Sequence, residues 1–252
     1  MKKKLFCVSD IHSYFSEMKE ALDEAGFESG NDNHMLVICG DLFDRGTESY
    51  QLLHWLYTIP NKILIRGNHE DLMSDMVDRG YPLTHDISNG TYTTAKDLAW
   101  DKDIQEINYQ KLYAIFDNLS LDMLDYYETK NYIFVHGWIP VKQTDDLPKY
   151  YARNRKFEYQ EDWRENGDWE AARWISPIEA YKAGITVPNK TIVCGHWHTS
   201  AAHCLLHNDG TEWGPDANFK PFYDNGIIML DACTAYSGMC NVVILEDELL
   251  DS

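Results

Sequence analysis

Five short apolar runs in this chain are each followed by residue types that bind metal ions and phosphate. The runs have the length and composition of buried strands: Leu5–Val8, Met35–Cys39, Ile63–Ile65, Tyr132–Val135 and Thr191–Cys194. The residues that follow them are, in chain order, Asp10 and His12, then Asp41, Asp44 and Arg45, then Asn68, His69 and Glu70, then His136, and finally His196 and His198. In α/β sheets, ligands bind beyond the carboxyl ends of the strands. We therefore expect these side chains to meet at one site.

Helix-like segments lie between these runs and predict an α/β fold. Each segment has apolar residues at helical spacing. The segments are Ser16–Ala25, with Ser16 as the expected N-cap and Gly26 as the stop, Glu48–Tyr57 and Glu70–Val77. Strands that alternate with helices at this spacing are typical of layered α/β proteins.

The rest of the chain is less regular. We expect a loop over Gly80–Gly90 and helical structure over Ala95–Asn118. The remaining expected strands are Asp122–Glu128, paired with Tyr132–Val135, and then Ile227–Leu230 and Val242–Leu245. Residues 142–189 are polar and rich in tyrosine and tryptophan, and we interpret them as a cap inserted within a single domain that spans residues 1–252.

The charge balance restricts the partners of the protein. The 252 residues carry 22 basic and 41 acidic side chains, a net charge of −19. Because nucleic-acid affinity depends on neutralising phosphates, neither broad nucleic-acid binding nor binding to anionic membranes is expected, although a local basic pocket can still hold one phosphate. Six cysteines without a Cys-x-x-Cys pair, and no run of transmembrane length, predict a reduced, cytoplasmic protein. No oligomeric state follows from these numbers.

The residues after the strands suit metal binding. Oxygen and imidazole ligands together are typical of sites for Mn²⁺, Fe or Zn²⁺, and the lack of a thiolate disfavours a structural zinc site. Two aspartates, one asparagine and up to four histidines are too many ligands for one ion. Two ions about 3.5–4 Å apart that share one carboxylate would use them all, and such pairs hydrolyse phosphate esters. Each pattern alone is also explained by a turn, a helix cap or a packed histidine, but the five together favour a metal site.

The motifs SDIHS, GDLFDRG, RGNHE, VHG and GHWH resemble those of the calcineurin-like metallophosphoesterases. Asp-Arg-Gly in the second motif and the glutamate after Asn-His are similar to the phosphoprotein-phosphatase-like branch, which holds bacterial and phage Ser/Thr phosphatases and symmetrical diadenosine tetraphosphate hydrolases. The segment LDACTAYSGMCNVVIL, residues 230–245, also resembles a strand-turn-strand of that branch. The resemblance is weak over residues 80–120 and 142–189. It implies a layered core of β-sheet sandwich flanked by helices.

The resemblance also implies a set of metal ligands. They are Asp10 and His12 for a first ion, Asp41 as the bridge, Asn68, His136 and His196 for a second ion, and His198 as a further ligand of the first. The implied cofactor is a pair of divalent ions, with Mn²⁺ as the first choice and Fe or Zn²⁺ as alternatives. The implied reaction is direct attack of a metal-bridging hydroxide on phosphorus, without a covalent phosphoenzyme.

Further roles are implied for residues beside the metal ligands. His69 would protonate the leaving oxygen as general acid, with Asp44 orienting its ring. Arg45 would bind the phosphoryl oxygens, with Asn68 beside it. The branch usually has a second phosphate-binding arginine in the cap, and Arg173 in AARWISP is the first candidate here. Its rivals are Arg153, Arg155 and Arg164.

Three functions remain open at this stage. The first-ranked hypothesis is a Ser/Thr protein phosphatase that acts on phosphomonoesters of a phosphorylated protein. The alternative is a hydrolase of dinucleoside polyphosphates or phosphodiesters, for which aromatic residues of the cap could stack a base, although packing explains them as well. These residues are Tyr150, Tyr151, Trp163, Trp169 and Trp174. The third hypothesis is a non-catalytic metal-binding scaffold. Every expected catalytic position carries a suitable residue, so the sequence gives this hypothesis no support.

Overall fold

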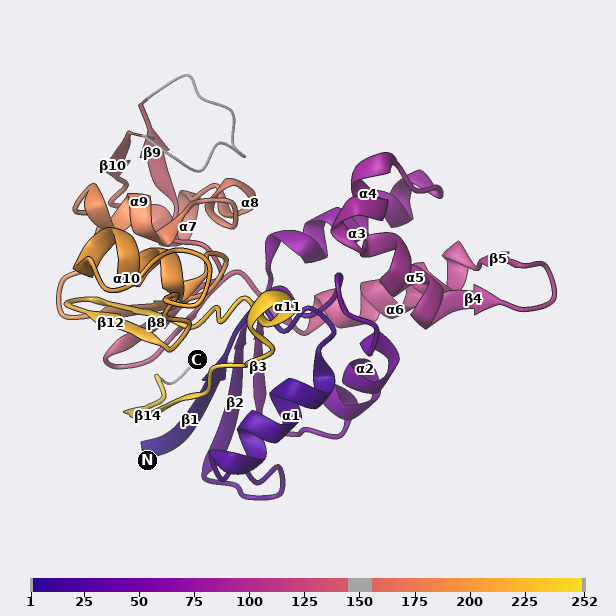
Figure 1. The fold of residues 1–252 in the computed structure, drawn as a ribbon, viewed down its shortest axis with the longest axis horizontal. Coiled ribbons are helices and arrows are strands. Elements are labelled where there is room, and N and C mark those ends of the chain that lie inside the picture. Colours follow the sequence, from indigo (N-terminus) through magenta and orange to yellow (C-terminus); the bar gives the residue numbers. More distant parts are fainter. Residues whose placement is uncertain (1, 145–155, 251–252) are drawn as a thin grey trace.

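Two five-stranded β-sheets form the centre of the protein (Figure 1). The structure is a computed structural model and describes residues 2–144 and 156–250. The first sheet has the order β14-β1-β2-β3-β6, and its strands are β1 (Lys2–Val8), β2 (His34–Cys39), β3 (Lys62–Ile65), β6 (Met123–Leu124) and β14 (Val243–Glu248). The pairing is parallel except between β14 and β1, which run antiparallel.

The second sheet has the order β12-β13-β11-β8-β7. Its strands are β7 (Tyr127–Glu128), β8 (Tyr132–Phe134), β11 (Thr191–Cys194), β12 (Phe222–Asp224) and β13 (Ile227–Met229). The three central strands are parallel and the two edge strands antiparallel. The pairing expected for Asp122–Glu128 is confirmed only at its end, because β7 pairs with β8 whereas β6 belongs to the first sheet.

The two sheets pack face to face. Leu5 and Cys7 of β1 lie in one buried cluster with Phe134, Val193 and Ile228 of the second sheet. The side chains that alternate with them in the strands belong to clusters shared with helices. Both faces of each sheet are therefore buried, and the predicted α/β fold with a β-sandwich core is confirmed.

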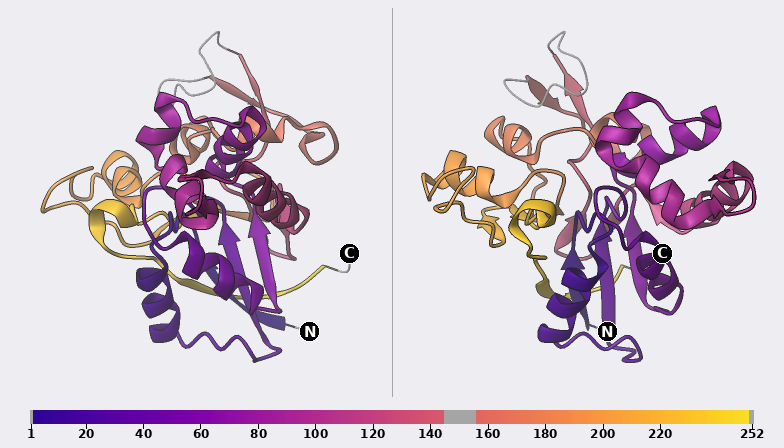
Figure 2. Two further views of the ribbon diagram at one scale, coloured as in Figure 1. Left: turned by 90° about the vertical axis from the view of Figure 1, so that its right-hand side faces the viewer. Right: turned by 45° about the vertical axis from the view of Figure 1, so that its right-hand side comes forward.

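Helices cover the outer faces of both sheets (Figures 1 and 2). The elements on the side of the first sheet are α1 (Phe15–Glu24), α2 (Ser49–Tyr57), α3 (Asn68–Arg79), α4 (Thr84–Asn89), α5 (Thr91–Ala99), α6 (Tyr109–Leu121) and the hairpin of β4 (Trp100–Asp101) and β5 (Glu106–Ile107). The later elements are the hairpin of β9 (Val141–Gln143) and β10 (Phe157–Tyr159), and the helices α7 (Trp163–Asn166), α8 (Trp169–Ala172), α9 (Pro177–Lys182), α10 (Thr199–His207) and α11 (Thr234–Ser237).

The start of α1 differs from the prediction. The helix begins at Phe15 with Tyr14 as its N-cap residue, so the expected N-cap at Ser16 is wrong. Ser16 donates from its backbone nitrogen (2.9 Å) and from its hydroxyl (2.6 Å) to the carboxylate of Glu48, the residue before α2. A carboxylate from another segment thus satisfies one of the free N–H groups at the start of α1.

Two expectations for residues 80–118 are corrected. The expected loop Gly80–Gly90 contains α4, because the Asp86 carboxylate accepts the backbone N–H of Leu83 (2.6 Å) and supports the first turn. The expected helix over Ala95–Asn118 is two helices, α5 and α6, separated by the β4–β5 hairpin. The Asp101 carboxylate accepts the N–H of Asp103 (2.9 Å), a turn-forming bond that competes with the helix.

The segment expected to be a cap packs mainly against the second sheet. Phe157, Trp163 and Ile178 are buried in one cluster with the strand residues Ile133 and Ile192. The cap role and the single-domain boundary stay predictions. In residues 2–144 and 156–250, no helix has the length and apolar character needed to cross a membrane.

Candidate functional site

The residues that follow the strands line one cavity of about 310 Å³. Nine of the residues named from the sequence contribute to its wall: Asp10, His12, Asp41, Arg45, Asn68, His69, Trp174, His196 and His198. Asp44 and His136 are buried, with 0% and 1% of their surface exposed. Parallel strands end at the same edge of a sheet, which is why residues from distant motifs meet here.

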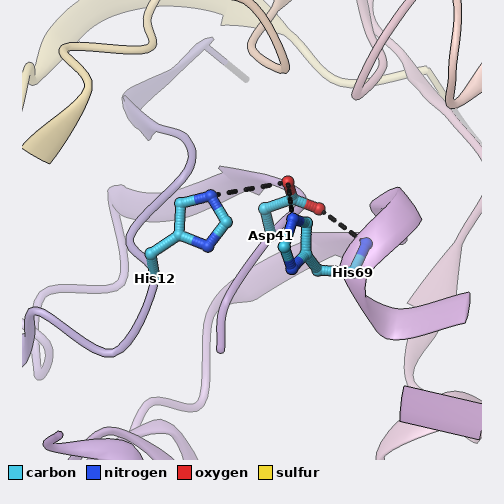
Figure 3. A group of neighbouring side chains, drawn as sticks. All are labelled: His12, Asp41 and His69. Carbon is cyan, nitrogen blue, oxygen red and sulfur yellow. Dashed lines mark hydrogen bonds and ion pairs between the residues drawn. The ribbon is translucent and has the colours of Figure 1, made fainter. Parts of the chain in front are cut away.

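Asp41 lies at the centre of the site, between two groups of histidines. Figure 3 shows Asp41 with the first group, His12 and His69. Its Oδ2 is 3.6 Å from Nε2 of His12 and 4.0 Å from Nε2 of His69. Its Oδ1 is 3.3 Å from Nε2 of His136 and accepts the backbone N–H of His69 (3.0 Å). The two oxygens thus face different groups, as a bridging carboxylate requires.

Hydrogen bonds behind the histidine rings fix which nitrogen faces the centre. Nδ1 of His12 donates to the Phe43 carbonyl (2.9 Å), and Nδ1 of His136 donates to the Cys39 carbonyl (2.8 Å). Such bonds set the tautomer of metal-binding histidines and leave Nε2 for the ion. Nε2 of His136 is also 2.9 Å from Oδ1 of Asn68, which places the amide oxygen at the same point.

The donors fit a pair of divalent ions. In the described residues, ligand atoms of His12, Asp41 and His69 lie within 4.8 Å of one another, and so do those of Asp41, His136 and His196. The two groups share Asp41. Asp10 lines the same cavity, and its two oxygens accept the backbone N–H of His196 (3.1 and 2.9 Å). Carboxylate and imidazole donors in this combination suit Mn²⁺, Fe and Zn²⁺.

Burial and mutual charge perturb the pKa values of these groups. Burial raises the pKa of Asp10 to about 6. Burial also opposes the charge of Asp41, but His136 and His69 beside it hold its pKa well below the ordinary value. The pKa of His136 rises to about 10 against the effect of burial, because Asp41 is adjacent. Burial and the neighbouring His136 lower the pKa of His196 to about 3, so that its ring is neutral, the form that binds metal.

His69 is held by a buried carboxylate. Its Nδ1 is 2.7 Å from Oδ2 of Asp44, and its Nε2 faces the cavity near Asp41. Burial lowers the pKa of His69, but Asp41 and Asp44 outweigh that effect and raise it above the ordinary value. The ring therefore has the geometry of a proton donor held by a carboxylate, although it also belongs to one of the two candidate ligand groups.

The two arginines expected at the substrate lie in different places. Arg45 is exposed and lines the cavity. Arg173 does not line it: its Nε and Nη2 donate to Asp71 (2.6 and 3.1 Å), and its Nη1 donates to Asp125 (2.8 Å). Its guanidinium is therefore engaged by two carboxylates. The rival Arg164 pairs with Glu128, and residues 153 and 155 lie outside the described residues.

His198 lies in an aromatic wall of the cavity and outside the two candidate ligand groups. Its ring is 4.4 Å from the ring of Trp213 and 5.8 Å from that of Trp197, and its Nε2 is 3.3 Å from a carboxylate oxygen of Glu212. The role of His198 as a metal ligand stays a prediction.

Several residues of the cavity were not named from the sequence. They are Leu72, Asn89, Trp197, Trp213, Asp231 and Cys233. Asp231 follows β13 as the other acidic residues follow their strands, so its position was a usable signal. Burial and the nearby Asp10 raise the pKa of its carboxyl well above the ordinary value. Trp213 carried no such signal, because it lies in an irregular segment after α10.

Backbone strain is concentrated at this site. Of the described non-glycine residues with positive φ, seven belong to it: Asp10, His12, Asp41, Asp44, Arg45, His196 and Cys233. Such backbone is costly and persists where the surrounding structure enforces it, commonly at functional sites. Gly67 and Gly195 allow the close approach, because a Cβ at these positions would overlap the carboxylates of Asp41 and Asp10.

Comparisons with known proteins agree with this geometry. The calcineurin-like phosphoesterase family matches residues 3–200. The symmetrical bis(5'-nucleosyl)-tetraphosphatase of Buchnera aphidicola subsp. Schizaphis graminum is 28% identical over 149 residues, 59% of this chain and 49% of that protein. The asymmetrical bis(5'-nucleosyl)-tetraphosphatase PrpE of Bacillus subtilis is 26% identical over 160 residues, 60% of this chain and 62% of that protein. The matched region thus spans about half to three fifths of these relatives.

A solved structure shares the fold. A protein serine/threonine phosphatase from Saccharomyces cerevisiae superimposes with a TM-score of 0.51 at 14% identity, over 99% of this chain and 81% of that chain. The family model matches most of this chain, and the histidines of the site, Asp10 and Asp41 come from the matched region. This chain therefore belongs to the calcineurin-like phosphoesterases.

Proposed function

We propose that this protein hydrolyses dinucleoside polyphosphates with the help of two divalent metal ions. One observation carries the choice of substrate. The wall of the cavity has three tryptophans, Trp174, Trp197 and Trp213, and Arg45 is the one lysine or arginine among the described residues that line it. Indole rings offer flat faces on which nucleobases stack. Three indoles in the wall suit a substrate that carries a nucleobase better than a phosphopeptide, which has no base to stack.

The proposed metal ligands come from both sheets. Asp10, His12 and Asp41 would hold one ion, and Asp41, Asn68, His136 and His196 the other; we propose Mn²⁺, and Fe or Zn²⁺ fit the same donors. Bound ions would act as Lewis acids on the phosphoryl oxygens and supply an acidified water as nucleophile.

The chain itself would provide the remaining groups of the reaction. Nε2 of His69 would donate a proton to the leaving oxygen. Asp44 holds the ring in place through the contact of its Oδ2 with Nδ1 of His69 (2.7 Å). Arg45 would bind the phosphoryl oxygens through its fixed fork of N–H donors. Asn68 would be a ligand of the second ion and would also bind the phosphoryl group next to that ion.

The aromatic wall gives the base a defined place. Trp213 is 47% exposed, and Tyr236 supports it edge-on at 5.1 Å. The ring of His198 contacts the rings of both Trp213 and Trp197 and lines the same cavity. Of the cap tryptophans, Trp163 is fully buried, so packing explains it. A base that stacks on Trp213 would extend from the cavity toward solvent, which leaves its phosphates at the metal-binding residues.

The relatives support the same class of substrate. The proteins of Buchnera aphidicola and Bacillus subtilis are bis(5'-nucleosyl)-tetraphosphatases by name. Because the chain spans 49% and 62% of these proteins, their substrate is carried over here as part of the proposal.

A Ser/Thr protein phosphatase is the second candidate. Its support is the exposure of Arg45 beside the cavity, since a phosphoserine on a protein surface needs an accessible phosphate-binding group. The proposed roles of Asp44, His69 and the metal ligands serve a phosphomonoester equally well. The cytoplasmic location remains a prediction under either candidate.

The test is a side-by-side assay of the Mn²⁺-loaded protein on diadenosine tetraphosphate and on a phosphoserine peptide, with p-nitrophenyl phosphate as a substrate that lacks both a nucleobase and a peptide. The variant is Trp213→Ala, and the matched control is Tyr223→Ala, another exposed aromatic residue that does not line the cavity. We expect Trp213→Ala to raise KM for the dinucleotide about tenfold, the order of magnitude of one lost base stack.

The outcomes separate the three hypotheses. Preference for the dinucleotide, lost in Trp213→Ala but kept in Tyr223→Ala, supports the proposal. Preference for the peptide, with Trp213→Ala unchanged on all substrates, supports the protein phosphatase instead. Absence of turnover on every substrate, with both ions bound, would favour the non-catalytic scaffold.

A further inference from the structure

Helix α5 begins directly against the loop that carries Asp44 and Arg45. Gly90, the residue before α5, has a φ of +92°, and a Cβ there would overlap the backbone nitrogen of Arg45. The start of the helix can therefore approach this loop only because residue 90 is a glycine. The two residues next to it on the buried face of α5 are Thr91 and Thr94, and both are fully buried.

Both threonines donate hydrogen bonds to the carboxylate that holds His69. Oγ1 of Thr91 donates to Oδ2 of Asp44 (2.7 Å), the same oxygen that meets Nδ1 of His69 (2.7 Å). Oγ1 of Thr94 donates to Oδ1 of Asp44 (3.1 Å) and accepts the backbone N–H of Asp44 (2.9 Å). Both carboxylate oxygens and the backbone of Asp44 are thus held by one face of α5.

These contacts define the plane of the Asp44 carboxylate. A carboxylate that meets only one partner can rotate about its Cβ–Cγ bond, and a histidine attached to it can rotate with it. Here the two hydroxyls fix both oxygens of a side chain that is 0% exposed. Because the Nδ1 contact fixes the direction of Nε2 in the imidazole ring, the threonines determine where Nε2 of His69 points in the cavity.

We propose that Thr91 and Thr94 are positioning residues for the proton transfer by His69, and this inference rests on the role proposed above for His69. Neither threonine lines the cavity. They act through Asp44, and they come from residues 80–120, the region in which the sequence resembles the family only weakly. A helix outside the recognised motifs thereby supports the proposed general acid.

The test uses two aryl phosphates that differ in their need for a general acid. p-Nitrophenolate leaves readily without a proton, whereas the phenolate of phenyl phosphate is a poorer leaving group and depends more on the acid. The variants are Thr91→Val and Thr94→Val, which keep the shape of the side chain and remove the hydroxyl. Thr93→Val is the matched control, because Thr93 lies on the exposed face of the same helix.

We expect Thr91→Val to lower kcat on phenyl phosphate about tenfold, the effect typical of a residue that orients a functional group, and to change kcat on p-nitrophenyl phosphate little. Thr91→Ser should restore both rates, because it returns the hydroxyl. The Nδ1 proton of His69, observed by NMR in the metal-free protein, should shift or broaden in Thr91→Val and stay unchanged in Thr93→Val. Thermal unfolding of each variant checks that it is folded.

His69→Asn distinguishes the two ways in which the inference can fail. If His69→Asn lowers both rates equally, His69 is not the general acid, and the inference falls together with that role. If His69→Asn is selective for phenyl phosphate but Thr91→Val and Thr94→Val lower both rates equally, only the inference is overturned, and the threonines are purely structural. If one valine variant does not fold, the other variant and Thr91→Ser decide the matter.

Discussion

At the scale of single residues, Asp41 determines the organisation of the site. Its Oδ2 faces His12 and His69, and its Oδ1 faces His136. A carboxylate in this position has to be charged to attract the histidines on both of its sides. The histidines around Asp41 keep its carboxylate charged although it is buried. The consequence is a high pKa for His136, which takes up the proton that balances Asp41 in the absence of a cation.

This coupling predicts a pH dependence of the metal-free protein. The pKa of His136 is about 10 in the folded state and 6.5 as its ordinary value. Between about pH 7 and about pH 8.5 the unfolded state has lost this proton and the folded state keeps it, so the free energy of unfolding falls as pH rises. With Mn²⁺ bound to the neutral ring, this contribution should vanish.

Denaturant unfolding at both pH values, in chelator and in Mn²⁺, measures the effect. His136→Gln is the control, and it should reduce the slope in chelator. A slope in the metal-free protein that His136→Gln leaves intact would assign the pH dependence to another group.

At the scale of elements, strands follow from the sequence better than helix boundaries do. The predicted strand Thr191–Cys194 has the same bounds in the structure. Strands are recognised from short apolar runs, whereas helix ends here depend on partners far away in the chain. The carboxylate of Glu48 accepts a backbone N–H at the start of α1 from a position 32 residues away in the chain, and no local sequence pattern predicts this hydrogen bond.

The contact between Glu48 and α1 predicts a stability effect. Glu48→Ala should lower the free energy of unfolding by about 1 kcal/mol, the usual value for the loss of a helix cap. Ser16→Ala should cost less, because the backbone N–H of residue 16 keeps its acceptor. Glu20→Ala, on the exposed side of α1, is the control. Equal stability of Glu48→Ala and Glu20→Ala in denaturant unfolding would show that this cap has no energetic value.

The sequence predicted that the proposed metal ligands would meet at one site, but it did not predict the aromatic wall, and the difference has a physical reason. Asp10, Asp41 and His136 follow strands, and the topology of a parallel sheet brings strand ends together. Trp213 and Thr91 lie outside such positions, and their places depend on how irregular segments and α5 pack. Arg173 was selected because the resemblance implies an arginine in the cap, and the carboxylates that engage it come from residues 71 and 125.

At the scale of the whole molecule, Arg173 links the segment that packs against the second sheet to a helix on the side of the first sheet. It follows α8, in the segment that packs against the second sheet, and it binds Asp71 on α3, the helix that carries Asn68 and His69. Its side chain is only 10% exposed. The ion pairs therefore fix the position of α3 relative to the second sheet.

Removing this link should affect stability more than substrate binding. Arg173→Ala should lower the free energy of unfolding by about 2 kcal/mol, between the values for exposed and for fully buried ion pairs, and leave KM for p-nitrophenyl phosphate nearly unchanged. Lys130→Ala, which breaks the exposed pair with Glu248, should cost less than about 1 kcal/mol and is the control. A large rise in KM at unchanged stability would return Arg173 to the role of a substrate ligand.

The hydrogen bonds from His196 to Asp10 link residues that are 186 positions apart in the chain. Contacts across so long a loop form late in folding, because closing the loop costs conformational entropy before the contact can compensate for it. A growing chain thus presents Asp10, His12 and Asp41 long before His136 and His196 are available. A cation that arrives early would meet half of its proposed ligands, and one that arrives after the second sheet has docked would hold the two layers together. The proposed binding of two ions would therefore require the finished fold.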